Sequence, residues 1–318
     1  MIEILEKALN IKKTKKKNAT HFVLCNKGKI RYLIALKYGK KRLILNISSY
    51  SRKLSLLMKM LNIIPFDILR ILKIGYFAKV DFNKEIEDYY KKITNEIFEH
   101  KNVYWNMIVG TYDNKQKLVI QSFNDNEKAI YFKIGDKNSN KEMISEIEFL
   151  SKKNTFKSFD IPKLLSSQKI NENNKFNIQV TQEFNGKKVT PILNDKVYEI
   201  FKEILSSKEI KIIDGIPYTF SHGDFAPWNL KMKDGKYILF DWEHCGIKFY
   251  GFDLIHFIFQ IENLLNKKSE KNALDVAVKL LLDYEKKNIK LDENKLKKMY
   301  IEEIKNEYKR IIKIEGEF

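Results

Sequence analysis

Cysteine and long apolar runs are scarce in this 318-residue sequence. The two cysteines, Cys25 and Cys245, lie in unrelated contexts and form no Cys-x-x-Cys pair. No apolar run approaches the roughly 18 residues that a membrane span needs, and the first residues, MIEILEK, lack the basic-then-apolar order of a signal peptide. We therefore expect a soluble, cytoplasmic protein with reduced thiols, and its 44% hydrophobic content suffices for a sizeable core.

Arginine is also scarce. Only five of the 59 Lys and Arg residues are arginines, although the formal net charge is +18. Proteins that read nucleic acids rely on arginine for bidentate contacts, and the sequence has neither a basic tail nor an RNA-binding motif. We therefore expect no nucleic-acid partner, while the basic surface should attract anionic partners such as nucleotides or acidic membrane.

The first hundred residues change character midway. Residues 21–47 contain three short β-rich runs, the last at 42–47, and predict a small antiparallel sheet. Residues 51–74 are dense in Leu, Met and Ile, and Pro65 should divide them into two short helices. These helices are expected to pack on the adjacent sheet, and the alternative is weak contact with an anionic membrane surface at the inner face of the membrane.

Beyond residue 100 the pattern is β-rich first and helical afterwards. Strands are expected at 104–110, 117–123, 129–134, 169–172 and 176–183, with a helix at 140–153 among them. Helices are then expected at 193–206, 251–266, 270–286 and 291–313, interrupted by a strand–loop block at 217–243. A β-rich half that leads into a helical half is the order expected of a two-lobed nucleotide enzyme.

The strand–loop block carries the residues with chemical potential. Residues 221–229 read SHGDFAPWN, which places Asp224 and Asn229 five positions apart in a short loop. Phosphoryl transfer needs a positioned hydroxyl, a carboxylate to accept its proton, and cations to neutralise the phosphate oxygens. A hairpin that turns at 233–235 should bring Asp241 back beside Asn229. A carboxylate and an amide oxygen that converge in this way suit Mg²⁺.

The combined pattern, HxDxxxxN followed by an apolar strand that ends in Asp, resembles the aminoglycoside phosphotransferase and choline kinase-like family. The strings FDWEHCG at 240–246 and YGFDL at 250–254 resemble it too. The resemblance implies an α+β, two-lobed protein-kinase-like fold, with an antiparallel β-sheet N-lobe and a mainly helical C-lobe. It also implies a phosphotransferase that uses ATP, or another NTP, together with Mg²⁺ and an alcohol group as acceptor.

The same resemblance assigns roles to four residues of the block. Asp224 would be the catalytic base, and His222 would orient the loop around it. Asn229 and Asp241 would be the metal ligands. A protein kinase is disfavoured, because Asp241 is not followed by the Phe-Gly of that class.

The family also implies a lysine that holds the nucleotide phosphates and pairs with a helix glutamate. Lys133 ends an apolar strand and is the natural candidate. Glu146 is the expected partner, although Glu142, one helical turn earlier, remains an alternative.

Three further positions are expected at the nucleotide. Gly110 would lie in the phosphate-covering loop, which has one glycine where protein kinases have three. Backbone groups near Gln182 and Phe184 would meet the purine, and simple core packing of Phe184 is the alternative.

Residues 1–100 fall outside the usual kinase core. Together with the catalytic strings, such an extension resembles phosphotransferase-like proteins associated with bacterial surface-polysaccharide synthesis. We therefore expect an N-terminal α/β extension at 1–100, an N-lobe at 101–186 and a C-lobe at 187–318. The expected reaction is phosphorylation of a hydroxyl on a small molecule or glycan precursor. The alternatives are a nucleotide-binding pseudokinase or scaffold in such a pathway, and a choline, ethanolamine or aminoglycoside kinase.

Overall fold

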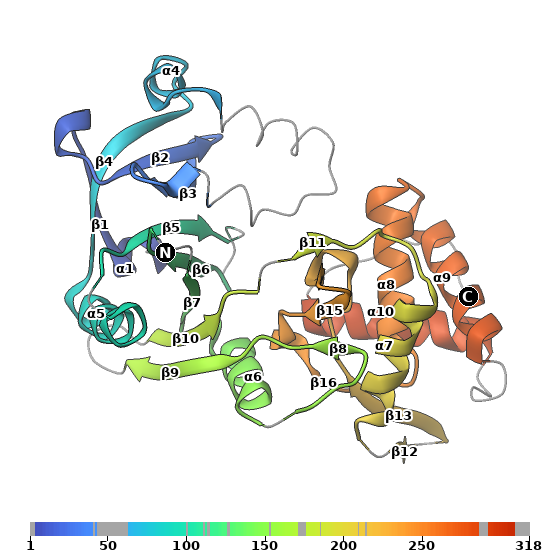
Figure 1. The fold of residues 1–318 in the computed structure, drawn as a ribbon. Helices are drawn as coiled ribbons and strands as arrows, with labels where there is room; N and C mark the ends of the chain where they lie inside the picture. The colour runs from blue at the N-terminus through green and yellow to red at the C-terminus, as the bar shows by residue number, and fades with distance from the viewer. Residues whose placement is uncertain are drawn as a thin grey trace. The chain divides into compact units, whose positions relative to one another are not determined.

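The computed structural model forms two compact units, Met1–Ser151 with Pro162–Asn185, and Lys152–Ile161 with Gly186–Phe318. Strands dominate the first unit and helices the second (Figure 1), which confirms the expected α+β, kinase-like fold class. The boundaries expected at 100 and 186 stay predictions. The described residues are 4–40, 42, 63–99, 101–110, 112, 115–125, 128–152, 154–170, 176–184, 186–208, 210–213, 215–285 and 292–308.

The first unit is built on a nine-stranded sheet in the order β1-β4-β2-β3-β5-β6-β7-β10-β9. Every neighbouring pair is antiparallel. The pair β3–β5, in which Leu33 lies opposite Met107, joins the strands of the first hundred residues to the later ones. The strands are β1 (Leu9–Lys13), β2 (His21–Asn26), β3 (Lys29–Ala35), β4 (Gly75–Phe82), β5 (Tyr104–Val109), β6 (Lys117–Phe123), β7 (Ala129–Asp136), β9 (Leu164–Ile170) and β10 (Phe176–Gln182).

Helix α5 (Lys84–Phe98) packs its buried face into this unit's core. It begins where the Asn83 side chain accepts a hydrogen bond from the Glu85 amide, and its buried face belongs to the same apolar cluster as Leu118 and Phe132 of the sheet. The other helices described in this unit are α1 (Ile4–Ala8), α4 (Phe66–Ile71) and α6 (Asn140–Ser151).

Two expectations for the N-terminal region were wrong. Arg42, the first residue of the strand expected at 42–47, is helical, as are Gly39 and Lys40 before it, and residues 43–47 lie outside the described residues. Strand β4 is not among the expected strands, although Phe77, Val80 and Phe82 are buried along it. Long-range pairing explains the missed strand, because β4 gains its hydrogen bonds from β1 and β2, far away in the sequence.

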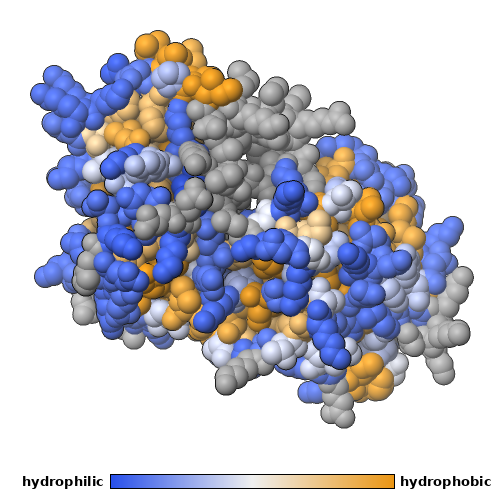
Figure 2. All heavy atoms as spheres, in the orientation of Figure 1, coloured by the Kyte–Doolittle hydropathy of each residue, from blue (hydrophilic) through white to orange (hydrophobic). Residues whose placement is uncertain are grey.

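The apolar stretch at 51–74 is described only from residue 63. Helix α4 starts directly after Pro65, and Leu69 is buried against Phe22 and Phe77 of the sheet. Ile71 and Leu72 are exposed, and Figure 2 shows hydrophobic side chains gathered over α4 at the top of the view. None of the helices in the described part of the chain is long and apolar enough to cross a bilayer. Contact of this stretch with an anionic membrane surface stays a prediction.

The second unit combines two small sheets with four long helices. The helices confirm those expected after residue 190: α7 (Asp195–Ser206), α8 (Phe252–Gln260, continued by a π-helical turn, Ile261–Leu265), α9 (Glu270–Glu285) and α10 (Glu293–Tyr308). One sheet contains β8 (Phe159–Asp160), β11 (Lys187–Lys188), β14 (Leu230–Lys233) and β15 (Lys236–Leu239), and the other contains β12 (Lys211–Ile213), β13 (Ile216–Ser221) and β16 (Gly246–Phe249).

A buried histidine lies in the first unit's sheet. His21 of β2 has its Nε2 3.0 Å from the Trp105 carbonyl oxygen, and its ring centroid is 4.0 Å from that of Trp105. Burial lowers the pKa of His21 from 6.5 to about 4, and the hydrogen bond to Trp105 offsets this only in part. The folded protein therefore holds this side chain neutral at mildly acidic pH.

We expect the protein to lose stability as the pH falls from 6.5 to 4. In this window the unfolded chain binds a proton at His21 and the folded chain does not, so the free energy of unfolding rises with pH by at most about 3 kcal/mol from this group. His21→Gln removes the titration and should flatten the dependence. Denaturant unfolding of both proteins between pH 4 and 7 measures the difference, and equal slopes would contradict the assignment.

Candidate active site

The catalytic-loop sequence lies between β13 and β14. It leaves β13 after Ser221 and enters β14 through a single 3-10 turn, Pro227–Asn229. Gly223 has a φ of 88°, and a Cβ at this position would lie 2.0 Å from the His244 carbonyl oxygen. The loop can therefore approach the turn at Trp242–His244 only with glycine between His222 and Asp224.

His222 is fully buried and organises the loop. Its Nδ1 accepts a hydrogen bond from the Asp224 amide at 3.2 Å, so Nε2 carries the proton and donates to the Phe240 carbonyl oxygen at 3.1 Å. Burial lowers the pKa of His222, which keeps this neutral tautomer in place. The Asp253 carboxylate accepts hydrogen bonds from the amides of His222 and Gly223 at 2.7 and 2.9 Å, and thus braces the loop.

Asp224 is held on both carboxylate oxygens. Asn229 Nδ2 donates to Oδ2 at 2.9 Å, and His256 Nε2 lies 3.0 Å from Oδ1. Burial by itself would raise the pKa of Asp224, but the hydrogen bond from His256 and the neighbouring His222 and His244 rings outweigh it and hold the pKa below its usual value. The Asp224 side chain is still 23% exposed, so an ionised carboxylate edge remains accessible to an acceptor hydroxyl.

The hairpin β14–β15 brings the two expected metal ligands together. Asp234 and Gly235 both have positive φ at its turn, as tight hairpin turns require. The Phe240 amide donates to the Asn229 carbonyl oxygen at 3.1 Å, so Asp241 follows immediately after a residue bonded to Asn229. Asp241 itself has a φ of 72°, an uncommon backbone conformation that recurs at functional positions.

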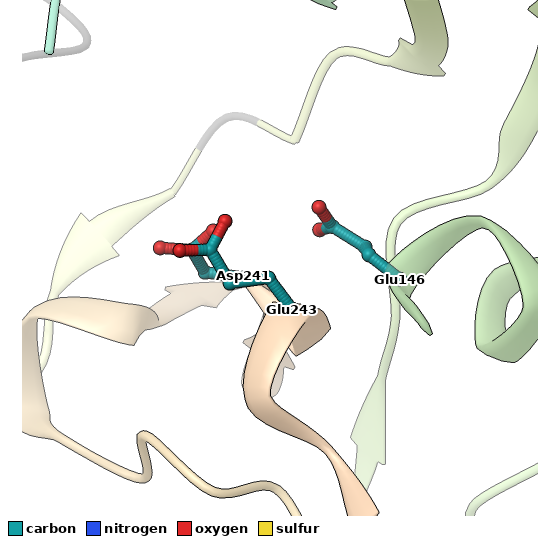
Figure 3. Close-up of side chains that lie close together, drawn as sticks. All are labelled: Glu146, Asp241 and Glu243. Atoms are coloured by element: carbon teal, nitrogen blue, oxygen red, sulfur yellow. The ribbon is translucent and has the colours of Figure 1, made fainter. Parts of the chain in front are cut away.

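The donor atoms at this hairpin fit a hard divalent cation. The Asn229 amide nitrogen donates to the backbone oxygen and Oδ2 of Asp224, which leaves Oδ1 as the atom for a metal. A carboxylate oxygen of Asp241 lies within 4.8 Å of one of Glu243, and both side chains project from the same turn (Figure 3). Carboxylate and amide oxygens are the ligands that Mg²⁺ prefers.

Lys133 and Glu146 form an ion pair in the first unit. Lys133 lies on β7, Glu146 on α6 (Figure 3), and Nζ donates to Oε2 at 2.7 Å. Glu142, the alternative partner, instead accepts a hydrogen bond from Lys115. Burial would raise the pKa of Glu142, but the bond from Lys115 keeps it below its usual value. The geometry thus separates the two glutamates, and the nucleotide role of Lys133 stays a prediction.

The other expected nucleotide positions are less well defined. The Gly110 amide donates to the Lys117 carbonyl oxygen at 3.0 Å at the start of the β5–β6 connection, in which Thr111, Asp113 and Asn114 lie outside the described residues. Gln182 is exposed at the end of β10, and its amide donates to the Lys163 carbonyl oxygen at 3.0 Å. The Gln182 N–H is therefore already bonded, so the backbone group of Gln182 that would meet a purine is its carbonyl.

Phe184 is half-buried, with its ring centroid 5.6 Å from that of Tyr131. This contact accommodates both the purine-binding role and the packing alternative, so its role stays a prediction.

Sequence reasoning missed the polar residues behind Asp224. His256 contacts the carboxylate directly, while Gln260 and Tyr300 contact His256. One signal was available, because Asp253 and His256 are three residues apart and therefore share a helix face next to the loop.

The comparisons with known proteins agree with the motifs. Residues 158–268 match the model of the phosphotransferase enzyme family, abbreviated APH. No curated protein matches the sequence.

Solved structures similar to this chain include a thermostable mutant of aminoglycoside phosphotransferase APH(4)-Ia, with a TM-score of 0.43, 8% identity, and coverage of 62% of this chain and 83% of that one. The amicoumacin kinase hAmiN is similar with a TM-score of 0.37 and 13% identity, over 73% of this chain and 81% of that one. The gentamicin complex of APH(2")-IIa is similar with a TM-score of 0.37 and 13% identity, over 70% of this chain and 95% of that one.

The matched segment contains both the catalytic loop and the strand that ends in Asp241. Residues 158–268 of this chain thus resemble the phosphotransferase enzyme family, as the two motifs predict.

Proposed function

We propose that this protein transfers the γ-phosphoryl group of ATP to a hydroxyl of a small molecule or glycan precursor in a Mg²⁺-dependent reaction. The observation that carries the proposal is the arrangement at the catalytic loop, where an accessible, ionised Asp224 lies beside Asn229 and one hairpin away from Asp241. These are the groups that phosphoryl transfer requires of a protein.

Asp224 acts as the general base in this proposal. The acceptor hydroxyl hydrogen-bonds to the exposed edge of the carboxylate and gives up its proton there, while the hydroxyl oxygen forms a bond to phosphorus and the bond to ADP breaks. Asn229 fixes the plane of the carboxylate through the hydrogen bond from its Nδ2. His222 fixes the loop backbone, because its Nδ1 accepts a hydrogen bond from the Asp224 amide.

Asn229 Oδ1 and Asp241, with Glu243 near Asp241, would hold the cation, which when bound neutralises charge on the phosphate oxygens. Lys133, fixed by Glu146, would hold the nucleotide phosphates. The net charge of +18 favours a neutral or anionic acceptor over a polycation such as an aminoglycoside.

A panel of acceptors tests the proposal. ATP consumption would be measured with amino-alcohols, sugars, nucleosides and aminoglycosides, with and without Mg²⁺, beside the Asp241→Asn variant. We expect one acceptor class to stimulate ADP formation strongly, and this stimulation should vanish without Mg²⁺ and in the variant. Calorimetry of ATP and GTP binding accompanies the panel. Nucleotide binding without turnover anywhere in the panel favours the pseudokinase or scaffold alternative, and absence of nucleotide binding overturns the proposal.

A further inference from the structure

Helix α8 places a second buried histidine against the catalytic carboxylate. His256 is only 2% exposed, and its Nε2 lies 3.0 Å from Asp224 Oδ1. On the other side of the ring, Nδ1 lies 3.0 Å from the hydroxyl of Tyr300, a fully buried residue of α10. A continuous polar chain therefore runs from Asp224 through His256 to the C-terminal helix.

The partners of His256 determine which nitrogen carries a proton. Nε2 faces a carboxylate oxygen, which can only accept, so Nε2 must be protonated and donate to Asp224. Nδ1 faces a hydroxyl, which can donate to a neutral ring or accept from a charged one. Both ring nitrogens are therefore satisfied in either charge state of His256.

The Gln260 amide lies next to the same nitrogen. Its amide group is 3.0 Å from His256 Nε2, and Gln260 Oε1 has no hydrogen-bond partner among the described residues. Rotation of the amide by 180° turns Oε1 toward the Nε2 proton, so that this proton is shared between Asp224 and Gln260. The histidine is thus fixed from three directions, by α8, by α10 and by the loop.

The catalytic loop itself supplies no side-chain donor to Oδ1 of Asp224. Residues 221–229 contain neither lysine nor arginine, and Asn229 reaches only Oδ2 of the carboxylate. His256 provides the complementary hydrogen bond to Oδ1 from another element. With a hydrogen bond to each oxygen, rotation of the carboxylate about its Cβ–Cγ bond is restricted, while part of the side chain stays exposed.

We propose that His256 is a positioning residue for phosphoryl transfer, which holds the Asp224 carboxylate in the orientation that accepts the acceptor proton, and that Tyr300 holds His256 in turn. This inference rests on the proposed function, because it gives His256 a part in the same reaction. It predicts an effect on the catalytic step and none on nucleotide affinity, since the Lys133–Glu146 pair is in the other unit.

Substitution of His256 by Gln and by Asn distinguishes the loss of its hydrogen bond to Asp224 from a change in packing. A glutamine side chain can place its amide nitrogen near the position of Nε2, whereas an asparagine reaches only the position of Nδ1. His256→Gln therefore keeps a donor for Asp224, and His256→Asn keeps only the group that faces Tyr300. With Mg-ATP as the probe and phosphate release to water as the measured turnover, we expect His256→Asn to lower kcat about tenfold at unchanged KM for ATP.

His256→Gln should recover most of the lost kcat, and Tyr300→Phe should give a smaller loss than His256→Asn. Equal losses in the Gln and Asn variants, or wild-type kcat in a folded His256→Asn protein, would overturn the proposal. If the wild-type protein releases no phosphate and no acceptor of the panel stimulates ADP formation, the proposed function fails instead.

A measurement on the wild-type fold covers the case in which the variants do not fold. Histidine side-chain ¹⁵N spectra should show a protonated His256 Nε2 whose resonance shifts in Asp224→Asn. An unprotonated Nε2 in the wild-type protein would overturn the proposal without any activity assay.

Discussion

Asp224→Asn should lower turnover by about 10²- to 10⁴-fold, the range that a general base contributes, and leave nucleotide affinity nearly unchanged. The amide has almost the shape of the carboxylate, so Asn229 and His256 still have a neighbour of the right size. What is lost is the negative charge that accepts the acceptor proton. Steady-state kinetics with the best acceptor and calorimetric titration with Mg-ATP measure the two quantities separately.

Asp195 supplies a matched control for this substitution. It is an exposed aspartate at the start of α7 in the same unit, and Asp195→Asn makes the same chemical change away from the loop. We expect it to retain wild-type turnover. Full activity of Asp224→Asn would remove the carboxylate from the mechanism, and a parallel loss of nucleotide binding would mean that the loop had rearranged.

Lys133→Met should lower kcat/KM for ATP by about 10- to 100-fold, because a hydrogen bond to a charged group contributes about 1.5–3 kcal/mol. Glu146→Gln should give a smaller loss in the same direction, since Glu146 acts only by holding Lys133. The double variant should lose little more than Lys133→Met alone, because both substitutions break one interaction. Initial-rate kinetics at varied ATP concentration give all three values.

The Lys91–Glu87 pair on helix α5 is a control of the same chemistry away from the expected nucleotide positions. The two side chains are one helical turn apart, and Lys91 Nζ lies 2.5 Å from Glu87 Oε1. Lys91→Met and Glu87→Gln should leave kcat/KM for ATP close to wild type. Two outcomes would show that neither pair has a specific role at the nucleotide. One is a loss of kcat/KM in the Lys133 and Glu146 double variant that equals the sum of the two single losses in free energy, and the other is an equal loss at the two pairs.

The part of the site predicted from sequence is the part built from local interactions. The Asp234-Gly235 turn and the short strands around it fix the hairpin within a few residues, so the approach of Asp241 to Asn229 could be predicted. The pairing of Lys133 with a glutamate of 140–153 was implied by the family resemblance, and the structure contains it between one strand and the next helix. The choice between Glu142 and Glu146 needed coordinates, since both face the same side of the helix.

Features that depend on distant contacts could not be predicted. Strand β4 has alternating buried residues, but its place in the sheet depends on β1 and β2, which are about fifty residues or more away in the chain. His256 reaches Asp224 across 32 positions, and its spacing from Asp253 indicates a shared helix face but not this contact. Helix α10 contacts His256 through the Tyr300 hydroxyl, 44 positions away in the chain.

The β3–β5 pair bears on how the chain can be divided. A chain that began near residue 101 would turn β5 into an outer strand, with the backbone groups that now bond β3 at Met107 and Ile108 facing water. Such an uncovered strand is a template for pairing with another molecule. Strand β3 therefore covers an edge of β5 that would otherwise be open to another molecule.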